Sequence, residues 1–289
     1  MPSVIVLNAR KRTRRLPGIR APKSVEARRR AMLDALIAPM LEDVATRLLS
    51  AEGNESRIMD TVFSIREAQA IWESYFSSIA DSFAYQWTTD VDLITKEKIA
   101  DSVGKALGVD MPMILDAPDV AESIRLSSVE AADLIRTIPK DYIGRVSQAV
   151  YQSFRQQPFP EGRTLAQEIQ FLSGVTRERA RVIARDQTSK MNASLTEIRQ
   201  TNLGIEEYIW RTAEDRRVVG TPGGKYPEGN SKHGNHYVRN GKIFRWDSPP
   251  PDGHPGWPIQ CRCVALGIVD RSKLREVTGR DGVTGWRLM

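Results

Sequence analysis

The regular recurrence of apolar residues every three or four positions is the feature that most limits how this chain can fold. From about Ser24 to Gly204 this spacing returns in one long segment after another, which is typical of amphipathic helices. The segment 176–204 keeps it for about five turns, with Thr176 suited to the N-cap and Gly204 to the position that ends a helix. An earlier apolar stripe runs at steps of four through Met32, Leu36, Met40, Val44 and Leu48.

After Gly204 the pattern changes to short alternating segments separated by loops rich in Gly and Pro. Segments 206–212, 240–246 and 261–269 alternate apolar and polar residues as strands do, and Asn240–Gly241 suits a tight turn. The sequence therefore predicts an α+β fold. A long, mostly helical N-terminal and central region is followed by a small, loop-rich α+β C-terminal domain.

Positive charge is concentrated near the N-terminus. The whole chain has a net charge of +6, yet residues 1–30 contain ten Lys and Arg residues and one acidic residue, Glu26. We expect a basic flexible arm over residues 1–23 that contacts nucleic acid or an acidic protein surface, through contacts that weaken as salt rises. A tail that only improves solubility is the alternative. The residues expected to make the contact are Arg10, Lys11, Arg12, Arg14, Arg15, Arg20, Arg28, Arg29 and Arg30.

The sequence gives no reason to expect membrane insertion or secretion. No apolar run approaches the roughly 18 residues that crossing a bilayer requires, and the N-terminal "SVIVL" is too short for a secretory signal. Two cysteines in 289 residues do not make a disulfide scaffold. We therefore expect a protein that stays in a reducing cytoplasm and has no membrane partner.

All three histidines and both cysteines fall within the 31 residues 233–263. Zinc prefers four N or S ligands, and thiolates bind it well, so His236, His254, Cys261 and Cys263 are a candidate set for a structural zinc site. The C-x-C spacing is shorter than that of most structural zinc sites. The alternative is that the cysteines are small inward-facing residues and the histidines bind backbone carbonyls.

A catalytic role for the same residues is the weaker hypothesis. His236 or His254 would act as the general base of a metal-dependent nuclease, near Asp215, Asp247 or Asp252. The chain has no paired-carboxylate pattern, no His-Glu-x-x-His helix and no phosphate-binding glycine loop. We therefore do not expect an enzyme.

Four ordered segments resemble motifs of the phage Mu F-like head morphogenesis family, the minor head proteins of tailed phages. They are "ARDQTSKMNAS" (184–194), "WRTAEDRRV" (210–218), "HYVRNGKIFRWD" (236–247) and "HPGWPIQCRC" (254–263). Gln187 stands where the family more often has Glu, and the loop after Val218 is longer than usual. The positions that match the family motifs are Arg185, Asp186, Trp210, Asp215, Arg217, His236, Gly241, Cys261 and Cys263.

The resemblance implies a head morphogenesis domain over residues 131–269, helical to 204 and then β-rich. A helical region at 24–130 would precede it, and a C-terminal tail at 270–289 would follow. It also implies a minor capsid protein without enzymatic activity, made in the host cytoplasm and carried in the virion. Its partners would be the portal protein, the major capsid protein or both, and DNA through the arm. A DNA-binding accessory protein is a further alternative.

Overall fold

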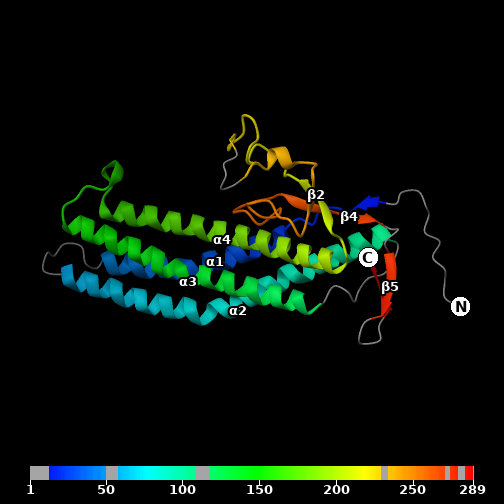
Figure 1. Ribbon diagram of the computed structural model, residues 1–289. Helices are drawn as coiled ribbons and strands as arrows, with labels where there is room; N and C mark the ends of the chain where they lie inside the picture. Colours follow the sequence, from blue (N-terminus) through cyan, green and yellow to red (C-terminus); the bar gives the residue numbers. More distant parts are fainter. Residues whose placement is uncertain are drawn as a thin grey trace. The chain divides into compact units, whose positions relative to one another are not determined.

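A computed structural model describes residues 13–49, 58–107, 117–228 and 234–270, together with two strands at 274–278 and 284–288 (Figure 1). Its contacts divide it into two compact units. The helical unit consists of Lys23–Trp87 and Leu126–Gln187, and the sheet unit contains the described parts of Met1–Pro22, Thr88–Arg125 and Thr188–Met289. Four long helices and a small antiparallel sheet confirm the predicted α+β class.

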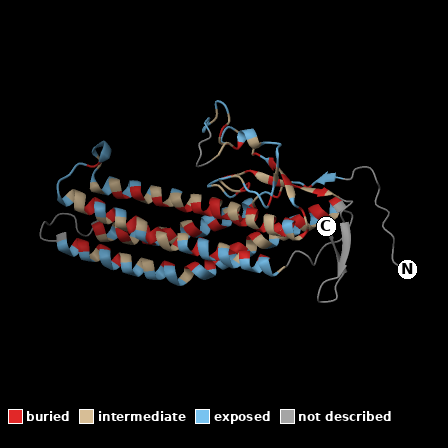
Figure 2. Cartoon of the chain, viewed as in Figure 1, coloured by how far each residue is buried: buried red, intermediate tan, exposed pale blue. Residues whose placement is uncertain are grey.

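The helices are α1 (Lys23–Leu49), α2 (Ile58–Leu107), α3 (Pro118–Phe154) and α4 (Leu165–Asn202). Buried and exposed residues alternate along each of them, as an amphipathic pattern requires (Figure 2). On α1 the buried stripe includes Leu33 and Ile37, whereas Met32 is exposed. Strict four-residue steps drift by about 40° each around a helix of 3.6 residues per turn, so the buried stripe needs three-residue steps as well.

Helix α4 begins earlier than predicted. Thr164 and Gln167 form a capping box, in which each side chain accepts from the backbone N–H of the other residue. Thr176 therefore lies inside the helix, where its hydroxyl donates to the carbonyl of Leu172. The end of the helix is as predicted, because Gly204 follows α4 with a φ of +77°.

The sheet unit contains a four-stranded antiparallel sheet in the order β1-β4-β2-β3. Its strands are β1 (Thr13–Arg15), β2 (Glu207–Arg211), β3 (Ile243–Arg245) and β4 (Val264–Asp270). Strand β4 begins after Cys263, so neither cysteine belongs to a strand, in contrast to the predicted strand 261–269. In the predicted tail, β5 (Leu274–Thr278) and β6 (Thr284–Leu288) pair antiparallel.

Part of the predicted arm belongs to the folded protein. Strand β1 pairs with β4, and Leu16 and Ile19 are buried in a core cluster with residues of α2 and β4. The backbone N–H of Leu16 donates to the carbonyl of Gly267, and Asn192 on α4 donates to the carbonyl of Ile19. Flexibility over the whole of 1–23 is therefore wrong for residues 13–22, because this segment pairs with β4 and its Leu16 and Ile19 side chains are buried. Arg10, Lys11 and Arg12 lie outside the described residues.

Among the described helices, none carries an apolar stretch of the length and hydropathy that a membrane span requires.

Candidate metal centre

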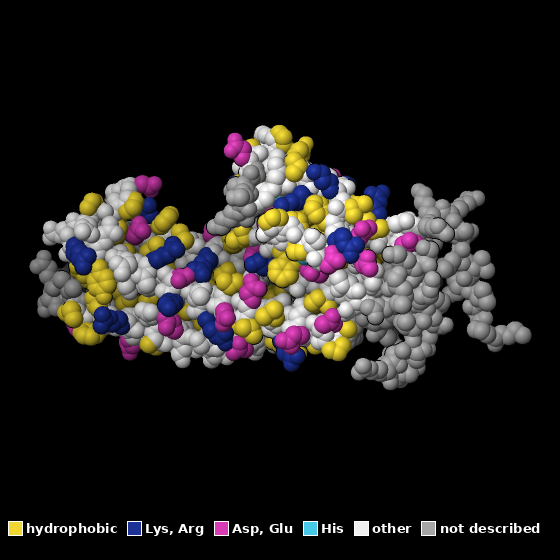
Figure 3. Space-filling model, in the orientation of Figure 1, with side chains coloured by type: hydrophobic (Ala, Val, Ile, Leu, Met, Phe, Trp, Pro, Cys, Tyr) yellow, Lys and Arg dark blue, Asp and Glu magenta, His cyan; other side chains and the backbone are white. Residues whose placement is uncertain are grey.

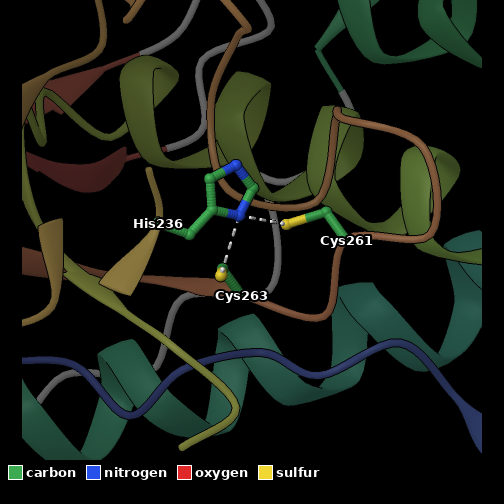
Figure 4. Close-up of side chains that lie close together, drawn as sticks. All are labelled: His236, Cys261 and Cys263. Carbon is green, nitrogen blue, oxygen red and sulfur yellow. Dashed lines mark hydrogen bonds between the residues drawn. The ribbon is translucent and has the colours of Figure 1, made fainter. Parts of the chain in front are cut away.

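Three of the four predicted metal ligands meet in the sheet unit. The Nδ1 atom of His236 lies 3.6 Å from the Sγ atom of Cys261 and 3.6 Å from that of Cys263 (Figure 4). The three ligand atoms lie within 4.8 Å of one another, and all three residues are buried. The distance between ring nitrogen and sulfur is short enough for one ion to contact all three atoms.

The backbone conformation next to each ligand places these side chains close together. His236 is the residue before a short 3₁₀ helix, η4 (Tyr237–Arg239). Cys261 follows Gln260, which adopts a left-handed φ of +54°, a conformation unusual for a residue with a side chain. Cys261 N–H donates to the carbonyl of Pro258, which closes the turn.

The same loop rests against α4 at a glycine. Gly256 has a φ of +95°, and a Cβ atom added there would lie 2.8 Å from the Cβ of Ala193. A glycine is therefore required by both the backbone conformation and the close approach to the helix.

The thiols and the imidazole shift one another's pKa. The hydrogen bond from Cys263 lowers the pKa of Cys261 despite its burial, and His236 lowers it further. The same contact and burial raise the pKa of Cys263. For His236, burial opposes the charged form, but Cys261 and Asp252 outweigh it and raise the pKa. These contacts favour the thiolate form of Cys261, which is the form that binds metals.

Two N–H groups oppose the rise in the pKa of Cys263 without reversing it. The indole N–H of Trp210 and the backbone N–H of Ala213 both act to lower its pKa. Trp210 is fully buried, and its ring meets the imidazole of His236 edge to face at 5.1 Å.

The donor set of one imidazole and two thiolates is typical of zinc. A tetrahedral ion bound by these three atoms would have one further position for a fourth ligand.

His254 is not the fourth ligand, and its place in the predicted set is wrong. Its Nδ1 accepts from the Tyr208 hydroxyl at 2.8 Å, and its Nε2–H donates to the carbonyl of Trp246 at 3.1 Å. Burial lowers its pKa, which favours the neutral ring. Both nitrogens are used to hold the aromatic core together. His233 lies outside the described residues.

Of the three carboxylates that the nuclease hypothesis placed near a histidine, Asp252 lies beside His236, whereas Asp215 and Asp247 pair with arginines. Asp252 Oδ2 lies 2.9 Å from Nε2 of His236, and its side chain is 3% exposed. Asp247 pairs with Arg245 on the surface, and Asp215 pairs with Arg262. Arg239, which pairs with Asp252, and Arg262 are site residues that the sequence patterns did not single out. Arg262 stands between the two cysteines, and this position in the sequence could have marked it as a site residue.

Most of the family-motif positions surround the triad. Trp210 contacts His236, and Asp215 accepts from the backbone N–H of Arg217. Gly241, with a φ of +80°, donates its N–H to the carbonyl of Trp210 and leads into β3. Arg185 and Asp186 belong instead to the helical unit, where Asp186 is buried on α4.

The predicted polyanion-binding arginines differ in exposure. Arg14, Arg15 and Arg20 in the sheet unit, and Arg28 and Arg30 in the helical unit, are exposed. Arg29 is 3% exposed, and its guanidinium lies 5.3 Å from the centre of the Phe83 ring. Because it packs against an aromatic ring, Arg29 is not available for such a contact. On the face shown in Figure 3, basic and acidic side chains of the described residues are interspersed.

Comparison with known proteins gives one relative of undescribed role. The chain is 28% identical over 280 residues to an uncharacterised protein of Haemophilus influenzae, which covers 93% of this chain. The chain spans 59% of the length of that relative. No family model matches the chain, and no solved structure does.

Proposed function

We propose that this protein is a minor head protein of a tailed phage, which associates with the portal protein and inner shell during head assembly and DNA packaging or delivery. One observation carries the proposal. Residues from three separate motifs that resemble the Mu F-like family pack into one buried cluster: Trp210, His236, Cys261 and Cys263. A shared cluster is what is expected if the motifs mark one folding module rather than chance matches.

Exposed arginines support contact with DNA or with an acidic protein surface. Arg14, Arg15 and Arg20 are exposed on the segment that β1 attaches to the sheet. A basic segment fixed at one end loses less conformational entropy when it binds than a free tail does. The contact is with phosphates or carboxylates and depends on salt.

Co-purification tests the assembly role. The full chain, expressed with the portal protein of the same phage, is expected to be retained with that protein, and mass spectrometry of purified virions is expected to detect it. A chain with Arg14, Arg15 and Arg20 changed to Ser separates the arginine contact from portal binding. The proposal is wrong if the wild-type chain neither binds portal or capsid protein nor occurs in virions.

We further propose that His236, Cys261 and Cys263 together bind a structural zinc ion. The loops that carry these residues are long and rich in Gly and Pro, and the aromatic core beside them is small. A bound ion would therefore join segments that have few other contacts to hold them.

Elemental analysis tests this assignment. We expect one zinc per chain in the wild type and a much lower content in Cys261→Ser. Equal zinc in the two proteins would contradict the assignment. The nuclease hypothesis has no comparable support, because His236 is 4% exposed and both of its ring nitrogens already face partners.

A further inference from the structure

The two ring nitrogens of His236 face different kinds of partner. Nδ1 faces the two sulfurs, and Nε2 lies 2.9 Å from Oδ2 of Asp252. A histidine that binds a metal through one nitrogen donates the N–H of the other, and the acceptor of that N–H fixes the tautomer and the ring orientation. In this protein the acceptor is a carboxylate.

Asp252 is itself held on several sides. Arg239 Nη1 lies 2.6 Å from Oδ1 of Asp252, and the guanidinium of Arg239 lies 4.9 Å from the centre of the Trp210 ring. The Trp210 ring in turn meets the imidazole of His236. The carboxylate is therefore confined between the imidazole that it orients and an arginine that neutralises its charge.

The backbone also leaves space for this arrangement. Gly234 has a φ of +64°, and a Cβ atom added there would lie 2.5 Å from Asp252 Oδ2 and 2.5 Å from Arg239 Nη2. Because any side chain at this position would collide with the ion pair, the glycine two residues before His236 fits the presence of the carboxylate.

We propose that Asp252 is a positioning residue of the metal centre. Its carboxylate accepts the Nε2–H of His236, which holds the imidazole so that Nδ1 faces the sulfurs as the ligand atom. The inference rests on the proposed metal site and adds to it a residue that does not touch the ion. In the competing explanation, Asp252 serves only as the counter-ion of Arg239.

Zinc affinity separates the two explanations. Competition with a chromophoric chelator at constant pH measures the affinity of the full chain for Zn²⁺, and circular dichroism of the zinc-saturated proteins checks folding. We expect Asp252→Ala to weaken zinc binding by about 10–100-fold, as loss of an outer partner of a metal-bound histidine does. Asp252→Asn should lose less, because its amide oxygen can still accept the Nε2–H.

Two further variants complete the test. Asp247→Ala removes another loop carboxylate that pairs with an arginine and lies on the surface, and it should leave zinc affinity unchanged. Arg239→Met removes the ion pair but leaves Asp252 facing His236, so the positioning role predicts a smaller loss than in Asp252→Ala. The counter-ion explanation predicts equal losses in these two variants.

The failures are distinguishable. Wild-type zinc affinity in Asp252→Ala, or equal losses in Asp252→Ala and Arg239→Met, overturns the role of Asp252 and leaves the metal site standing. A wild-type chain that binds no zinc overturns both proposals. If Asp252→Ala does not fold, Asp252→Leu takes its place, because leucine has a similar size and cannot accept the Nε2–H. Undiminished zinc affinity in that variant overturns the inference.

Discussion

The carboxylate of Asp215 accepts two hydrogen bonds from the guanidinium of Arg262, with Nη2 2.6 Å from Oδ1. Arg262 stands between the two cysteines of the triad, whereas Asp215 follows β2. The pair therefore connects the segment that carries both sulfurs to the turn after β2, one of the two inner strands of the sheet. The guanidinium holds the pKa of Asp215 well below its usual range.

Arg262→Lys tests this connection. A lysine keeps the charge but loses the two parallel hydrogen bonds, so we expect a loss of about 0.2–1 kcal/mol in the free energy of unfolding, the range of a partly exposed ion pair. Urea unfolding of the zinc-saturated protein measures the loss. Arg245→Lys, at the surface pair with Asp247, is the matched control and should change stability less. Equal losses in the free energy of unfolding at the two sites would mean that the Asp215–Arg262 pair stabilises the fold no more than the surface pair does.

Removal of the metal should lower thermal stability. An ion that binds only the folded state stabilises it by about 4 kcal/mol when its free concentration is 1,000 times Kd. Differential scanning calorimetry of the wild type should therefore give a lower Tm in chelator than in excess zinc. In Cys261→Ser the two conditions should give the same Tm. A Tm shift of wild-type size in this variant would show that the ion binds elsewhere.

His254→Phe should affect stability but not zinc binding. The substitution leaves the buried Tyr208 hydroxyl and Trp246 carbonyl without the ring nitrogens that they now contact, at a cost of about 1–3 kcal/mol. Zinc content should stay at the wild-type level, in contrast to His236→Phe, which removes a ligand. Loss of zinc from the folded His254→Phe protein would restore His254 to the ligand set.

Glu197 makes the free energy of unfolding depend on pH. Burial raises the pKa of this carboxyl group, although the indole of Trp257 donates to it and acts in the opposite direction. The folded state therefore favours the protonated form. This contribution is complete below the unfolded pKa of about 4.3 and is lost as pH rises through the higher folded pKa.

Glu197→Gln removes the ionisation and keeps an acceptor for Trp257. We expect a higher Tm than wild type at neutral pH and no difference well below pH 4, measured by thermal unfolding in a series of buffers. Glu228→Gln, an exposed residue of the sheet unit, should give no such pH-dependent difference. A Glu197→Gln protein that is less stable than wild type at neutral pH would contradict the raised pKa.

The left-handed backbone conformation at Gln260 is strained for a residue with a side chain, whereas glycine would adopt it without strain. Gln260→Gly should leave stability unchanged or raise it by up to about 1 kcal/mol, because glycine adopts this φ without strain. Gln148→Gly, in the regular helix α3, should lower stability by about 0.5–1 kcal/mol. Urea unfolding of both variants provides the comparison, and a clear loss in Gln260→Gly would mean that its side chain matters more than its backbone.

Periodicity predicted the helices and strands well, since amphipathic patterns depend only on local spacing. The start of α4 was misplaced because Thr164 and Gln167 cap it upstream of Thr176, the residue that the sequence favoured as the N-cap. The clustering of His and Cys in the sequence located the candidate site. It could not separate His236 from His254, because that choice depends on which loop residues fold next to the cysteines. Asp252 was one acidic residue among several, and its role follows only from its distance to His236.

The pairing of β1 with β4 joins two segments that are far apart in the sequence, with Thr13 opposite Asp270. Contacts between residues so distant in sequence raise contact order, and such contacts form late because a long loop must close first. During synthesis, β1 leaves the ribosome long before β4 exists. Strand β1, an outer strand of the sheet, can therefore pair only after β4 has been synthesised. The exposed arginines on this segment reach their final positions late in folding.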